Sequence, residues 1–212
     1  YSYKQAIKIK PDNAVAYNNM GVALKDRGEL DAAIDSYKQA IKIKPDYAEA
    51  YYNMGIALKD KGELDAAIDS YKQAIKIKPD YADAYSNMGV ALMEKGEFDA
   101  AIDSYKKALK IKPDYAEAHN NLGVALNDKG NLGAAIDSYK QALKIKPDYT
   151  EAYGNMGIAL KGIKFNSPKT DLPEIIIKLL DKKTYVRPSD IALSTISLIK
   201  SGEAFQSVLS KY

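Results

Sequence analysis

A 34-residue repeat constrains this chain more than any other feature of its sequence. The dipeptide Pro-Asp returns at a constant interval, with its prolines at positions 11, 45, 79, 113 and 147. An internal period of roughly 20–50 residues indicates stacked structural units rather than one compact domain. Four full repeats occupy residues 11–44, 45–78, 79–112 and 113–146, and a half repeat follows at 147–161. Residues 1–10 match the second half of a repeat.

Each repeat predicts two helices joined by a tight turn. In the second repeat we expect helices over residues 46–61 and 63–78. Pro45 suits a first helical turn or the break before it, and Gly62 suits the left-handed residue that ends a helix. Acidic residues early in the second helix and lysines late in it complement the helix dipole. The repeat is therefore predicted to be a helix-turn-helix unit.

The repeat resembles the tetratricopeptide repeat family, over roughly residues 2–161. Repeat positions are counted here from the third residue after each proline. The family expects large side chains at positions 4, 7 and 11, small ones at 8, 20 and 27, an aromatic at 24 and proline at 32. In the second repeat these positions hold Tyr51, Met54, Gly55, Leu58, Ala67, Tyr71, Ala74 and Pro79. The resemblance implies an all-α fold, a right-handed superhelical α-solenoid of helix-turn-helix units.

A glycine stands in the middle of every first helix, as Gly55 does in the second repeat. Glycine inside a helix costs about 1 kcal/mol relative to alanine. Close approach of the second helix would offset this cost, and we expect Ala67 and its equivalents to be the small partners in that approach. Most of the 17 tyrosines also recur at fixed repeat positions. They are interpreted as packing residues within and between repeats.

The other face of the first helix supplies the candidate binding residues. Positions 2, 6 and 9 lie close together on a helix, opposite positions 4, 7 and 11. Position 6 is asparagine in all five repeats, and an amide offers both the donor and the acceptor that an extended peptide backbone requires. Tyr52, at position 5, borders this face. The candidate peptide-binding residues are Asn19, Asn53, Asn87, Asn121 and Asn155, with Val22, Ile56, Val90, Val124, Tyr52, Glu49, Asp83 and Glu117.

The asparagine ladder is similar to that of the O-linked N-acetylglucosamine transferase repeats. That resemblance implies that the asparagines hold a peptide by its main chain in the concave groove of the superhelix. The alternative interpretation is that recently duplicated repeats inherited asparagine as a polar surface residue. Tetratricopeptide domains that grip acidic C-terminal tails carry lysines at positions 2 and 5 and asparagines at positions 6 and 9, of which this chain shares only position 6. This chain lacks that carboxylate clamp, because position 2 is mostly acidic and position 9 is aliphatic.

Composition and charge exclude several other functions. Thirty-one Lys+Arg against 28 Asp+Glu give a net charge of +3, too even for a nucleic-acid-binding surface. No apolar run approaches the length of a membrane span. With no cysteine and one histidine, metal and acid–base sites lack their usual residues. His119 takes the place of a packing tyrosine. No catalytic constellation is present in the repeats, so we expect neither an enzyme nor a cofactor.

After Gly162 the repeat register fails. Apolar residues at helical spacing predict that residues 162–212 form a helical C-terminal cap or connector. This segment weakly resembles the connector that follows such repeats in bacterial proteins with a C-terminal transferase domain. Because the chain starts within a repeat and lacks an initial methionine, we expect it to be a piece of a longer protein. The apolar Ala6, Ile7 and Ile9 then lack a partner helix and favour self-association through uncapped solenoid ends.

The sequence thus predicts a protein–protein interaction module that binds an extended peptide or partner protein in its concave groove. The alternative is the substrate-selecting N-terminal arm of a multidomain transferase, acting on glycosyl or sulfo groups, whose catalytic domain lies outside the chain. The absence of cysteine is compatible with the cytoplasm, which is the expected location.

Overall fold

The computed structural model describes residue 5 and residues 9–160, and it divides the chain into two compact units, residues 1–113 and 114–212. The described residues form α-helices and connecting turns, with no β-strand among them. The predicted all-α repeat fold is confirmed. The predicted cap or connector at 162–212 lies outside the described residues, as do Ala6 and Ile7 of the uncapped end.

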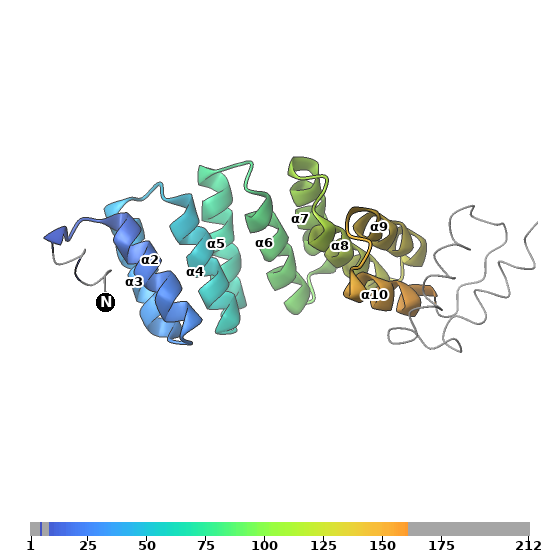
Figure 1. The fold of residues 1–212 in the computed structure, drawn as a ribbon, viewed down its shortest axis with the longest axis horizontal. Coiled ribbons are helices and arrows are strands. Elements are labelled where there is room, and N and C mark those ends of the chain that lie inside the picture. Colours follow the sequence, from blue (N-terminus) through green and yellow to red (C-terminus); the bar gives the residue numbers. More distant parts are fainter. Residues whose placement is uncertain (1–4, 6–8, 161–212) are drawn as a thin grey trace, which may run out of the picture. The chain divides into compact units, whose positions relative to one another are not determined.

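The first unit holds three helix pairs. Within each pair the two helices pack against one another, and the second helix also contacts the first helix of the following pair. Consecutive helices therefore lie side by side in chain order (Figure 1). The helices are α2 (Ala14–Asp26), α3 (Leu30–Ile43), α4 (Ala48–Asp60), α5 (Leu64–Ile77), α6 (Ala82–Glu94) and α7 (Phe98–Ile111).

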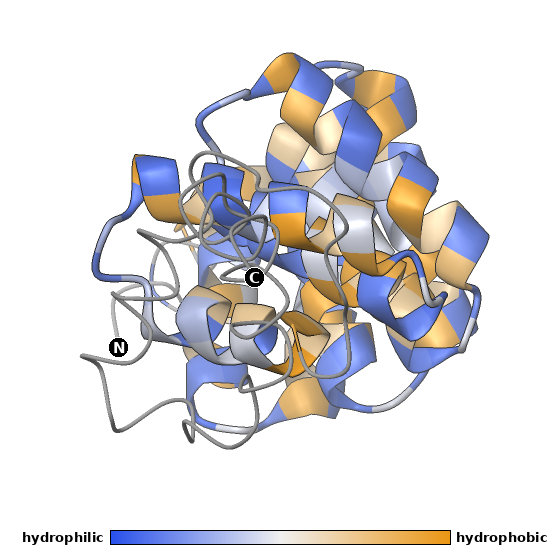
Figure 2. Cartoon of the chain, turned by 90° about the vertical axis from the view of Figure 1, so that its right-hand side faces the viewer, coloured by the Kyte–Doolittle hydropathy of each residue, from blue (hydrophilic) through white to orange (hydrophobic). Residues whose placement is uncertain are grey.

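The second unit repeats the same arrangement over its described part. Helix α8 packs against α9, and α10 contacts both of them. The helices are α8 (Ala116–Asp128), α9 (Leu132–Ile145) and α10 (Thr150–Leu160). In Figure 2 orange and blue residues alternate around individual helices, so each helix has an apolar side for packing and a polar side.

The turns follow the sequence expectation, whereas the helices begin slightly later than expected. Gly62 has φ of 84°, in the left-handed region that favours glycine. Helix α4 begins at Ala48 rather than residue 46, because Pro45 and Asp46 form the turn before it. Helix α5 begins at Leu64 rather than residue 63: Glu63 is the N-cap, whose carbonyl accepts from the backbone nitrogen of Ala67.

The mid-helix glycines do permit a close approach, and the side chain nearest to them is a tyrosine ring rather than the expected alanine. A Cβ built on Gly55 would lie 2.6 Å from Cε1 of Tyr71, a fully buried ring on α5. Gly123 on α8 meets the ring of Tyr139 on α9 in the same way. Ala67 is also fully buried, yet an aromatic ring occupies the space above the glycine. The absent side chain therefore makes room for tyrosine at position 24 of the repeat.

Candidate functional site

Adjacent first helices are joined by hydrogen bonds between polar side chains at positions 5 and 6. In the first unit, Nδ2 of Asn53 donates to Oδ1 of Asn18 at 3.0 Å. One repeat later, Nδ2 of Asn87 donates to the phenol oxygen of Tyr52 at 2.8 Å. The position-6 asparagine thus donates to position 5 of the preceding repeat. The sequence did not reveal that part of the amide's capacity is used within the protein.

Tyr52 is the centre of an aromatic cluster in the first unit. Its ring centroid lies 4.8 Å from that of Tyr81 and 6.1 Å from that of Tyr71, with tilted planes. Burial is the main cause that raises the pKa of each phenol, and nearby Asp83 adds to the effect on Tyr52. Tyr52 therefore packs against two tyrosine rings of the first unit, and its phenol oxygen accepts a hydrogen bond from Asn87.

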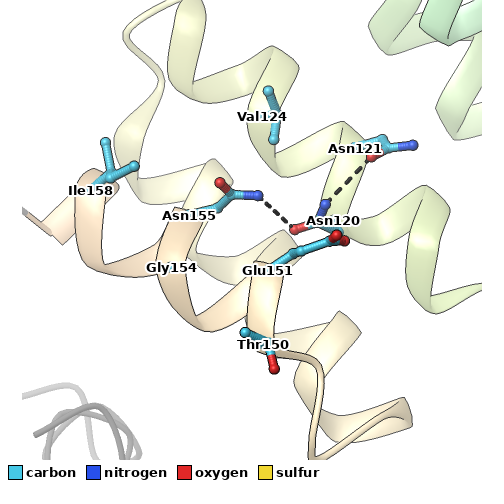
Figure 3. Close-up of a pocket in the computed structure, with 8 residues that line it drawn as sticks. All are labelled: Asn120, Asn121, Val124, Thr150, Glu151, Gly154, Asn155 and Ile158. Atoms are coloured by element: carbon cyan, nitrogen blue, oxygen red, sulfur yellow. Dashed lines mark hydrogen bonds between the residues drawn. The ribbon is translucent and has the colours of Figure 1, made fainter. Parts of the chain in front are cut away.

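The second unit carries a depression between α8 and α10, with a volume of about 620 Å³ (Figure 3). Helix α8 contributes positions 5, 6 and 9 to it, and α10 contributes positions 1, 2, 5, 6 and 9. Its size falls within the range of roughly 300–1,000 Å³ that is usual for ligand sites. The residues that line this α8–α10 depression are Asn120, Asn121, Val124, Thr150, Glu151, Gly154, Asn155 and Ile158.

The amides in the α8–α10 depression form a directional chain. Nδ2 of Asn155 donates to Oδ1 of Asn120 at 3.0 Å, and Nδ2 of Asn120 donates to Oδ1 of Asn121 at 3.4 Å (Figure 3). Asn120 is 5% exposed, so its two hydrogen bonds satisfy a buried amide. These hydrogen bonds hold the Asn155 side chain so that its Oδ1 is turned away from Asn120.

Position 2 of both helices that form this depression carries a carboxylate. Glu151 lines the depression, and Glu117 lies at the equivalent position of α8, exposed to solvent. Burial, followed by the charges of these two glutamates, raises the pKa of the Tyr149 phenol to about 12. Both carboxylates therefore lie close enough to one phenol to influence it. Lys146 lies over the ring of the same tyrosine, with Nζ 4.8 Å from the ring centroid.

The structure brings three of the candidate residues together in the α8–α10 depression: Asn121, Val124 and Asn155. Glu117 stands nearby without lining it. The other candidates lie on α2, α4 and α6 of the first unit. Sequence reasoning left five lining residues out of the candidate set: Asn120, Thr150, Glu151, Gly154 and Ile158. The sequence did offer one indication for Asn120, because two amide residues stand side by side at positions 5 and 6 of that repeat.

Three further expectations concern His119, a membrane span and a metal site. His119 on α8 is partly buried at the position where other repeats carry a packing tyrosine. Across the described ranges, no helix combines the length and the apolar character that crossing a membrane requires. The ionisable side chains of these same residues form no group of three or more suited to holding a metal ion.

Comparison with known proteins identifies the repeats. A model described as "TPR repeat" matches residues 1–26, 23–62, 57–96 and 91–128, and one described as "Tetratricopeptide repeat" matches residues 116–149. The chain belongs to the tetratricopeptide repeat family. No curated protein sequence matches it. The family resemblance inferred from repeat positions is thus confirmed, whereas the likeness of its asparagine ladder to the transferase repeats is not.

Solved tetratricopeptide structures share the fold. A crystal structure of MamA is 35% identical, covers 68% of this chain and 85% of that chain, and has a TM-score of 0.65. A second MamA structure is 29% identical, covers 81% and 92%, and has a TM-score of 0.69. YrrB, described as "a TPR protein with an unusual peptide-binding site", is 22% identical, covers 93% and 97%, and has a TM-score of 0.68. At that identity the likeness to YrrB concerns the fold alone.

Proposed function

We propose that this tetratricopeptide chain is a protein–protein interaction module that binds an extended peptide or partner segment along its first helices. The observation that carries the proposal is the α8–α10 depression. It combines fixed amides with the aliphatic side chains of Val124 and Ile158, of which Ile158 is 63% exposed. A peptide needs both features, since its backbone requires hydrogen-bonding partners and its side chains gain from apolar contact.

The amide chain supports this function by preparing the site before a ligand arrives. Asn155 uses Nδ2 to hold Asn120, and its Oδ1 has no hydrogen-bonding partner within the described part of the chain. A peptide N–H can bind that oxygen without the cost of ordering a free side chain, which improves affinity. Asn53 and Asn87 make equivalent internal bonds in the first unit, so the same capacity recurs there.

No observation favours the transferase-arm alternative. The matched families are tetratricopeptide repeats, and none of the similar solved structures is described as a transferase. The interaction module therefore stands as the one function proposed, with its peptide-binding residues drawn from positions 2, 5, 6 and 9 of the first helices.

A peptide-array screen on two matched variants tests the proposal. Gly154 and Gly133 are both helical glycines of the second unit with no atom within 4 Å of a built Cβ. Gly154 lines the depression, whereas Gly133 lies on α9 outside it. We expect the wild type and Gly133→Tyr to bind the same set of peptides, and Gly154→Tyr to lose those peptides that occupy the depression. Equal binding by both variants, or no peptide bound by the wild type, would contradict the proposal.

A further inference from the structure

We infer that the α8–α10 depression binds a lysine or arginine side chain of its peptide. The inference rests on the proposed function and adds the chemistry of the occupant. Among the eight lining residues, the ionisable side chain is that of Glu151, and neither lysine nor arginine is present. The second carboxylate, Glu117, stands at the same tyrosine as Glu151. A cation entering the depression therefore meets negative charge from both helices.

The hydrogen-bonding groups point to the same occupant. The amide nitrogens of Asn155 and Asn120 are already donating to Asn120 and Asn121. Figure 3 shows the nitrogen of Asn121 directed away from the other lining side chains. Two acceptor groups line the depression beyond these amide bonds, namely Oδ1 of Asn155 and the carboxylate of Glu151, which also hydrogen-bonds with the phenol of Tyr149. A site rich in acceptors favours a ligand rich in donors, and ammonium and guanidinium groups carry donors alone.

The apolar part of the lining suits the stem of such a side chain. Val124 and Ile158 lie on one side of Asn155, and Glu151 lies on the other (Figure 3). A lysine or arginine entering over the aliphatic side chains would bury its methylene groups there and place its charge at the glutamate. Long cationic side chains commonly combine these two contacts.

An equivalent pair of first helices in the first unit, α2 and α4, shows what distinguishes the α8–α10 depression from that pair. Helices α2 and α4 carry the same residues at six of the eight lining positions: Asn18, Asn19, Val22, Glu49, Asn53 and Ile56. They differ at Ala48, where the depression has Thr150, and at Tyr52, where it has Gly154. Tyr52 places a ring beside this face, whereas Gly154 leaves the space open.

Lys146 places a positive charge next to Tyr149. Its Nζ lies over the ring of Tyr149. The charges of Glu117 and Glu151 raise the pKa of that tyrosine's phenol. Lys146 is not among the lining residues, so it does not occupy the depression. It reduces the net negative charge at the edge, and we therefore expect a moderate rather than a large preference for cations.

The test uses an array-selected peptide that binds the wild type. It is synthesised with lysine, arginine, norleucine or glutamate at each position in turn, and binding is measured by fluorescence anisotropy. Norleucine has the aliphatic stem of lysine without its charge. At one position we expect lysine and arginine to bind about tenfold more tightly than norleucine, because a hydrogen bond to a charged group adds roughly that factor. High salt should reduce the gap.

Two glutamate variants make the result specific. Glu151→Gln should remove the preference for lysine over norleucine, whereas Glu49→Gln, at the equivalent position of α4, should leave it unchanged. Both glutamates are exposed, so neither change should prevent folding, and circular dichroism verifies this. Equal affinity for lysine and norleucine at every position overturns the inference and leaves the proposed function standing. Failure of the wild type to bind any peptide would remove both.

Discussion

The pairs α2–α4 and α8–α10 have the same hydrogen-bonding framework but different surfaces. Asn53 donates to Asn18 and Asn155 donates to Asn120, each at 3.0 Å. Asn18 and Asn120 are buried to nearly the same extent, at 6% and 5% exposure. The main difference is at position 5 of the later helix, where Tyr52 faces an aromatic cluster and Gly154 opens a depression. The same hydrogen bonds therefore recur in both pairs of helices, whereas the residue at position 5 determines the surface above them.

The largest expected effect that separates the two units is alkaline destabilisation. Burial raises the pKa of Tyr37, Tyr71, Tyr81 and Tyr105 in the first unit, and of Tyr139 and Tyr149 in the second. An unfolded tyrosine loses its proton near pH 10, whereas folded Tyr149 keeps it to about pH 12. The unfolded state then binds fewer protons, so stability falls as pH rises through this window.

We expect each buried ring to contribute about 1 kcal/mol of lost stability per pH unit in that window. Thermal unfolding followed by circular dichroism from pH 8 to 12 measures the total. Tyr52→Gly, which gives α4 the residue of α10, should lower the pKa of Tyr81 because Tyr52 helps to raise it. The variant has one phenol fewer, so the comparison concerns the remaining tyrosines. If their absorbance titrates at the same pH as in the wild type, the role given to the cluster is contradicted.

The next largest effect compares two glycines within the second unit. Gly123→Ala would press a Cβ into the ring of Tyr139, and we expect a loss of about 1–3 kcal/mol, as for overpacked cores. Gly154→Ala meets no atom within 4 Å and should gain up to about 1 kcal/mol from helix propensity. Urea unfolding of both variants measures the difference. Similar values for the two would show that the contact with Tyr139 relaxes without cost.

A smaller effect tests the shared framework directly. Asn18→Ala and Asn120→Ala each remove the acceptor of a hydrogen bond between adjacent repeats. We expect each change to cost about 1 kcal/mol, the usual net value of such a bond. Because the two environments match, the two costs should agree within experimental error in urea unfolding. A clear difference would mean that Tyr52 and Gly154 influence the amides as well as the surface.

The smallest effect concerns the start of the second helix. Helices α3, α5 and α7 carry an aspartate in the first turn, whereas α9 has Gly133 at that position. Gly133→Asp should stabilise the second unit by about 0.3–1 kcal/mol, since a negative charge near a helix N-terminus complements its dipole. Gly133→Lys is the control of opposite charge and should gain less. If both variants gain equally in thermal unfolding, helix propensity alone explains the change.

The sequence predicted the features that lie within one repeat. The spacing of proline, glycine and apolar residues was sufficient for the helix pairs and for the left-handed turn at Gly62. It also showed that Gly55 had to be small, but not that the ring of Tyr71 lies against it. A pattern along one helix identifies where space is needed, whereas the side chain that fills it depends on the packing of the second helix.

The candidate site was predicted in part for the same reason. Position 6 was assigned from its amide chemistry, and Asn121 and Asn155 do line the depression. The bond from Asn155 to Asn120 joins two repeats, so it depends on how adjacent helices are aligned. Gly154 was unremarkable as a residue type, and its importance follows from the side chain that Tyr52 supplies at the equivalent place. Such features depend on how the helices of adjacent repeats pack in space.

The amide bonds between repeats have a consequence for how the chain folds. The three found among the described residues each span 35 residues, from Asn53 to Asn18, from Asn87 to Tyr52 and from Asn155 to Asn120. Adding a repeat would add another bond of the same span without creating a longer one. Relative contact order therefore falls as repeats accumulate, and low contact order is associated with rapid folding. A lineage could lengthen or shorten such a chain by whole repeats without slowing the formation of any single interface.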